Sequence, residues 1–284
     1  MMPRPSLLLA ALLPLLTACE TVLTDYEAPA ARPLLVVEGG IERRPDADSL
    51  VQRIVLSTTR AFVGPNAAPP AVETATVTVS DGITTFPFLH EGGGVYVCRG
   101  LAGRVGTTYT LRLTWDGATY TATETLLPVP AIERVYTEFV PGGAFSDDGV
   151  YVKLDTQDPA NAPNHYLWRL FIDGELQMNP DPGNSREVIA SDEFFDGQPL
   201  RGLTPNGEIA VVPGDTVRVE QVAISKRRYD YLFAIFNLTA STPLFGDPPP
   251  ANPPGNIRNE QPGGPAALGY FGAAEVSVAG LIVP

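Results

Sequence analysis

The side chains best suited to chemistry form two compact groups of carboxylates. Asp192, Glu193 and Asp196 make up the first group, and Asp155 and Asp158 make up the second. Calcium binds about six to eight oxygen ligands, several of them carboxylates, and the first group could supply three of them. Neither group has the alternating spacing of an EF-hand calcium loop. The pattern therefore favours a solvated hairpin tip over a metal site.

Catalysis by histidine has little support, because the chain contains only two histidines, His90 and His165. A Ser-His-Asp triad needs an exposed serine nucleophile, and neither histidine accompanies the G-x-S-x-G motif that exposes one. No cluster of Cys and His residues has the spacing of a zinc site. We therefore expect no enzyme activity, no bound metal and no cofactor. A hydrolase that uses Asp192 or Glu193 remains the alternative.

Cys19 carries the most specific signal in the sequence. It follows Leu16-Thr17-Ala18, and a leucine-rich apolar stretch preceded by Arg4 lies directly before these residues. Such a charged start, short apolar stretch and small residues form a secretory signal, and a cysteine at the cut site is typical of a bacterial lipoprotein. We expect residues 1–18 to be removed, Cys19 to carry palmitate or similar acyl chains, and residues 19–32 to form a tether. The alternative is a transmembrane anchor, but a bilayer-spanning helix needs roughly 20 apolar residues.

The charge and the remaining cysteine exclude several classes of function. The formal net charge is −13, which disfavours binding to nucleic acid or to an anionic membrane surface through general electrostatics. Acylation of Cys19 would leave Cys98 as the only other cysteine, so no disulfide is expected. Cys98 ends the strand-like run Gly94–Cys98, which indicates a small buried residue rather than a nucleophile.

Alternating apolar and polar residues indicate β-strands through most of the chain. In Tyr109–Trp115 and in Tyr166–Ile172, every second residue is apolar, as in strands with one face in a core. The pairs Asp116-Gly117 and Asp173-Gly174 follow these runs, and Asp-Gly favours tight hairpin turns. We therefore expect antiparallel sheets, with both tryptophans in the core rather than exposed as sugar-binding aromatics.

The fold class predicted from these strands is all-β, with two β-sandwich domains. Residues 128–131 are typical of a stiff proline linker. The linker would divide an N-terminal sandwich at 33–127 from a C-terminal antiparallel sandwich at 132–284.

Two segments of the C-terminal domain break the strand pattern. One amphipathic helix is expected at about 226–239, with Ser225 as its N-cap. Its apolar residues recur at helical spacing and should pack on a sheet: Tyr229, Leu232, Phe233 and Phe236. The segment 243–265 is rich in proline and cannot be a central strand, so a long ordered loop is expected there.

Several motifs occur in an order that resembles a known family. They are Cys19–Val22, Leu35–Gly39, Tyr166–Leu170, Asp192–Gly197, Gly214–Val217, Tyr229–Leu232, Pro254–Ile257 and Ala267–Phe271. This set is similar to the Bacteroidota lipoproteins of domain of unknown function 4249, over nearly the whole mature chain. The resemblance implies an outer-membrane lipoprotein with an N-terminal immunoglobulin-like or carboxypeptidase-regulatory-like sandwich. It also implies an accessory role beside TonB-dependent receptors, and it transfers no catalytic residue.

These observations predict a lipid-anchored binding or accessory protein of the outer membrane, with a TonB-dependent receptor as its partner. A structural or adhesion role in the envelope is the alternative. Loops on rigid sandwiches are common recognition sites. The candidate partner-contact residues lie in the acidic loop and in the proline-rich loop: Asp192, Phe194, Phe195, Pro249 and Asn256. The ligand, the oligomeric state and the side of the membrane stay open at this point.

Overall fold

The computed structural model describes residues 32–45, 50–60, 68–143, 148–177, 188–207, 209–240 and 252–284. The expected signal at 1–18, Cys19 as the expected lipidation site, nearly all of the expected tether and Pro249 lie outside the described residues. Among the described helices, none is both long and apolar enough to cross a membrane.

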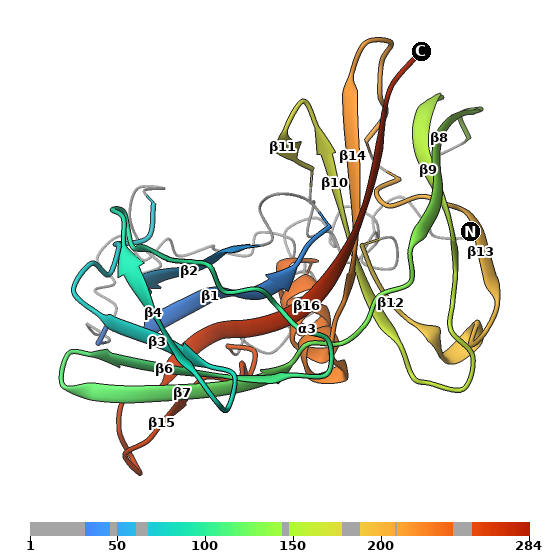
Figure 1. Ribbon diagram of the computed structural model, residues 1–284. Helices are drawn as coiled ribbons and strands as arrows, with labels where there is room; N and C mark the ends of the chain where they lie inside the picture. The colour runs from blue at the N-terminus through green and yellow to red at the C-terminus, as the bar shows by residue number, and fades with distance from the viewer. Residues whose placement is uncertain are drawn as a thin grey trace, which may run out of the picture. The chain divides into compact units, whose positions relative to one another are not determined.

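The described chain is mostly β-structure with one long helix (Figure 1), which confirms the all-β class. A 13-stranded sheet and a 3-stranded sheet occur among the described residues. In spatial order the large sheet contains β11 (Glu175–Leu176), β10 (His165–Ile172), β14 (Thr216–Ala223), β16 (Ala267–Ile282), β1 (Leu35–Arg43), β2 (Val51–Thr58), β5 (Val95–Arg99), β4 (Thr85–His90), β3 (Thr76–Ser80), β6 (Thr108–Trp115), β7 (Ala118–Thr125) and β15 (Arg258–Asn259), and β12 (Ile189–Ser191) also pairs with β10. The small sheet contains β13 (Pro199–Leu203), β9 (Gly149–Gln157) and β8 (Ile132–Val140).

The two predicted Asp-Gly hairpins are confirmed. Asp116 and Gly117 have φ of 49° and 74° between β6 and β7, and Asp173 and Gly174 have φ of 51° and 84° between β10 and β11. Positive φ at both central positions is what the tight hairpin turn requires, and Asp tolerates it better than most side chains.

The last strand, β16, joins strands from both sides of the 128–131 segment (Figure 1). It pairs in parallel with β1, from Leu35 opposite Ala267 to Arg43 opposite Glu275, and antiparallel with β14. The parallel pairing departs from the antiparallel expectation, because a contact between the first and last of the described strands leaves no turn signature in the sequence. The limits 33–127 and 132–284 stay a prediction.

The proline segment at 128–131 runs beside β16. The Val129 amide donates to Glu275 Oε2 at 2.9 Å, and the Ile132 amide donates to Ser277 Oγ at 2.9 Å. The Pro130 carbonyl accepts a hydrogen bond from Gln221 Nε2 at 2.9 Å. These bonds hold the segment against the large sheet.

The helix α3 (Lys226–Ala240) confirms the predicted amphipathic helix. Ser225 Oγ accepts a hydrogen bond from the Arg228 amide at 3.2 Å, so Ser225 is the N-cap. Phe236 is buried beside Val222 and Ala274, and Tyr229 and Leu232 pack on the same cluster, whereas Phe233 is exposed.

The remaining predictions for the core are also confirmed. Trp168 is buried in a core cluster that also contains residues of β9 and β14, and Trp115 is partly buried against the core of the N-terminal strands. Cys98 is a buried free cysteine, and burial raises the pKa of its thiol. A raised pKa keeps the thiol protonated and unreactive.

Candidate functional site

The acidic loop predicted as a contact region follows β12 as the short 3-10 helix η3 (Asp192–Phe194). Its neighbouring residues point in opposite directions. Asp192 is buried, and Phe195 packs partly against the cluster that contains Trp168. Phe194 is 95% exposed, the highest fraction among the large apolar side chains of the described residues. The loop therefore presents one phenylalanine to solvent from a buried base.

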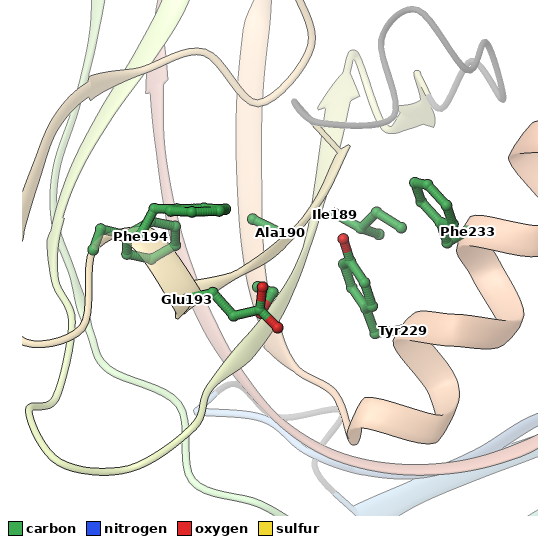
Figure 2. Close-up of a pocket in the computed structure, with 8 residues that line it drawn as sticks. Ile189, Ala190, Glu193, Phe194, Tyr229 and Phe233 are labelled. Atoms are coloured by element: carbon green, nitrogen blue, oxygen red, sulfur yellow. The ribbon is translucent and has the colours of Figure 1, made fainter.

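A cavity of about 480 Å³ lies between this loop and helix α3. Figure 2 shows Glu193 and Phe194 on one side, Tyr229 and Phe233 of the helix on the other, and Ile189 and Ala190 between them. The rings of Tyr229 and Phe233 are stacked, with centroids 6.1 Å apart. The walls are mostly apolar, and Glu193 contributes one carboxylate to them.

One of the two histidines, His165, contacts a residue that lines this cavity. The His165 ring lies 5.2 Å from that of Tyr229. Burial lowers the pKa of His165, and the carboxylate of Asp192 acts in the opposite direction. The imidazole is therefore neutral at pH 7 and serves as an aromatic surface behind Tyr229.

The structure regroups the carboxylates predicted from the sequence. Oxygen atoms of Asp158, Asp192 and Asp196 lie within 4.8 Å of one another. Glu193 turns to the cavity instead, and Asp155 accepts hydrogen bonds from Arg134 and from the Gly202 amide. The grouping depends on the contact between the β9–β10 connection and the acidic loop, which sequence spacing does not show.

The clustered carboxylates accept hydrogen bonds from the surrounding chain. Asp158 accepts from the Tyr166 hydroxyl and, at 2.8 Å, from the Gly197 amide. Asp192 Oδ2 accepts a hydrogen bond from the backbone amide of Asn164 at 2.7 Å, and Asp196 Oδ1 accepts one from the backbone amide of Asn161 at 2.9 Å. Burial raises the pKa of the Tyr166 hydroxyl, and its bond to Asp158 adds to the effect. These bonds fix the position of the loop that carries Phe194, and the cluster carries no metal assignment.

The other candidate contact residue of the described chain lies inside the fold. Asn256 is 2% exposed, and its side chain pairs with the backbone of Phe271 in both directions. Its Nδ2 donates to the Phe271 carbonyl at 2.7 Å, and its Oδ1 accepts from the Phe271 amide at 2.9 Å. Asn256 thus fastens the end of the proline-rich loop to β16 and is not available to a partner in this structure.

Tyr229 and Phe233 are site residues that sequence reasoning did not assign to a site. Both belong to the helical stripe that was expected to pack on a sheet. Phe233 stays exposed because its turn of the helix faces the cavity rather than the sheet. The signal in the sequence was the width of the stripe, which holds more aromatic rings than one packed face needs.

Comparison with known families and proteins adds one match. A family model described as domain of unknown function (DUF4249) matches residues 22–279. This range includes the small sheet, the large sheet except the end of β16, helix α3, the acidic loop and the cavity beside it. No match was found among curated proteins.

Proposed function

The chain belongs to the DUF4249 family, and we propose that it is a lipid-anchored binding protein of the outer membrane that works with a TonB-dependent receptor. Acyl chains on Cys19 hold it to the membrane, and residues 19–32 give the folded part reach. Several acyl chains together anchor a protein firmly, whereas one chain alone binds only marginally. The lipoprotein signal and the family resemblance support this placement.

The observation that carries the binding role is the exposure of Phe194 beside an apolar cavity. A large apolar side chain in water next to further apolar surface is typical of a protein–protein contact. Aromatic residues at such positions often contribute most of the binding energy. Phe194 also stands on a fixed base, because Asp192 and Asp196 are hydrogen-bonded to the β9–β10 connection. A loop whose backbone is already held in place loses little conformational entropy on binding.

Substitution of Phe194 tests the contact. Phe194→Ser is expected to lower recovery of the receptor at least about tenfold in a detergent pull-down, because truncating a central aromatic contact costs about 2 kcal/mol or more. Phe194 makes few contacts with its own chain at 95% exposure, so the fold should keep its thermal stability.

Ile83→Ser is the matched control. Ile83 is 92% exposed in the turn between β3 and β4, well separated in sequence and strand order from the cavity. This variant should recover as much receptor as the wild type. The proposal would be contradicted if Phe194→Ser recovered as much receptor as the wild type, or if the wild type brought down no receptor. The structural or adhesion role would then be the better explanation.

A further inference from the structure

A second cavity, of about 630 Å³, opens where β1, β10, β14, β16 and helix α3 meet. Its lining includes Gly40 and Gly272, which are opposite each other in the parallel pairing of β1 and β16. An added Cβ on Gly40 would lie 1.9 Å from the Gly272 carbonyl oxygen, so the two strands approach closely only because this residue has no side chain. The size is that of a small-molecule site.

Behind the wall of this cavity lies Glu220, the centre of a network of charges that includes arginines of the wall. Glu220 is fully buried, and its two carboxylate oxygens accept from Arg44 Nη1 at 2.6 Å and Nη2 at 3.1 Å. Arg218 also donates to Glu220, and Arg169 Nη2 lies 2.8 Å from it. Three arginines therefore share one buried carboxylate.

Glu42 is the second carboxylate of the network. It accepts hydrogen bonds from Arg44 Nε and from Arg169 Nη1, each at 2.9 Å. Glu38 and Arg53 at the exposed rim offset each other in charge. Glu124 lies outside the cavity lining and forms an ion pair with Arg227, with 3.9 Å between Glu124 Oε2 and Arg227 Nη2.

Arg228 is the fourth arginine of the wall, and its guanidinium group makes no hydrogen bond or ion pair with the described residues. The group lies over Gly272, where an added Cβ would be 2.5 Å from Arg228 Nη1. Burial lowers the pKa of Arg228, and the charge of Arg169 acts in the same direction, whereas Glu42 opposes both. A partly buried guanidinium without an acceptor is costly unless something else supplies one.

The inner wall therefore carries an excess of positive charge in an acidic protein. Four arginines, Arg44, Arg169, Arg218 and Arg228, face the two carboxylates of Glu42 and Glu220. Arg169 is paired with both carboxylates, but its Nε is buried without a hydrogen-bond partner among the described residues. The accessible donors belong to Arg228 and to Arg218, whose guanidinium lies 3.8 Å from the ring centroid of Phe171.

We propose that this cavity binds a small organic carboxylate with an apolar body. The carboxylate accepts hydrogen bonds from Arg228 and Arg218, and the apolar body lies against Phe171, Leu176 and Leu232. Guanidinium groups are well suited to carboxylates because they present paired donors in one plane. A phosphate monoester carries about −1.5 to −2 at pH 7 and would be repelled by Glu38 and Glu42, so a monoanion fits the wall better.

This site is separate from the proposed receptor contact, because the two cavities share no lining residue. Binding can therefore be measured on the purified chain without its lipid and without a receptor. Loss of the receptor contact and loss of carboxylate binding would be distinguishable results.

Calorimetric titration with 4-phenylbutyrate tests the proposal. The wild type is expected to bind it with a Kd of about 1 mM or tighter. 4-Phenylbutyramide, which lacks the charge, should bind at least about tenfold more weakly, and inorganic phosphate should bind more weakly than the carboxylate.

Arg228→Gln should raise the Kd for 4-phenylbutyrate at least about tenfold, since it removes a charged hydrogen bond. Lys226→Gln is the matched control: it makes the same change in charge in the same helical turn, outside the cavity, and should leave the Kd within about twofold. Gly272→Ala keeps every charge but displaces the Arg228 guanidinium, and it should also weaken binding.

Three results would overturn the proposal. The first is that the folded wild type does not bind 4-phenylbutyrate. The second is that it binds 4-phenylbutyramide as tightly as 4-phenylbutyrate. The third is that Arg228→Gln binds 4-phenylbutyrate with the same Kd as the wild type. Arg228 makes no hydrogen bond through its guanidinium, so Arg228→Gln should melt no lower than the wild type, and thermal unfolding verifies that the variant is folded.

Discussion

Replacing Glu220 with glutamine is expected to destabilise the fold by about 3–5 kcal/mol. Glu220 is fully buried and is the shared carboxylate of Arg44, Arg169 and Arg218. Its removal leaves guanidinium charges inside the protein with too few acceptors, which costs far more than the loss of an exposed ion pair. Urea unfolding followed by circular dichroism measures the change.

The control for this prediction is Glu133→Gln. Glu133 pairs with Arg201 at 2.6 Å, but the two side chains are 45% and 49% exposed. Water screens such a pair, so this variant should lose about 1 kcal/mol or less. If Glu220→Gln lost no more stability than Glu133→Gln, the buried charges around Glu220 would not stabilise the fold more than an exposed ion pair does.

Acid is expected to destabilise the protein through Glu42. Burial alone would raise the pKa of Glu42. Two arginines outweigh burial and lower this pKa from 4.5 to about 2: Arg169 acts through its charge and its hydrogen bond to Glu42, and Arg44 acts through its charge. Because the folded-state pKa is depressed, the stabilisation is complete above about pH 4.5 and is lost as the pH falls through about 2. The shift corresponds to roughly 3 kcal/mol of stability.

The comparison that isolates this effect is between Glu42→Gln and the wild type at pH 5 and pH 2. Between pH 5 and pH 2, the free energy of unfolding of the wild type should fall by roughly 3 kcal/mol more than that of Glu42→Gln, because glutamine does not titrate. Glu133→Gln, which removes an exposed carboxylate, should follow the wild type. An acid sensitivity that is the same in Glu42→Gln and the wild type would rule out Glu42 as the titrating group.

Elements defined by neighbouring residues could be predicted from the sequence. The turns at Asp116-Gly117 and Asp173-Gly174 follow from the backbone preferences of two adjacent residues. The helix start at Ser225 follows from a side chain that accepts from an amide three residues later. The position of Phe194 in an acidic loop is also local, so the sequence alone places it among the candidate contact residues.

Features that depend on distant pairing could not be predicted in the same way. The parallel contact of β1 with β16 brings Gly40 to Gly272, and no short-range pattern records it. The cluster of Asp158 with Asp192, and that of Arg44 with Glu220, likewise join segments far apart in the chain. Sequence spacing grouped the carboxylates by proximity in the chain, whereas the fold groups them by contact.

Intact mass spectrometry of the chain extracted from the outer membrane tests the lipid-anchored binding protein most directly, since the receptor contact depends on that placement. The expected product begins at Cys19 and is heavier than the unmodified polypeptide by a diacylglyceryl group and an amide-linked acyl chain. A chain that retains residues 1–18, or one that begins at Cys19 without lipid, would contradict the proposed function.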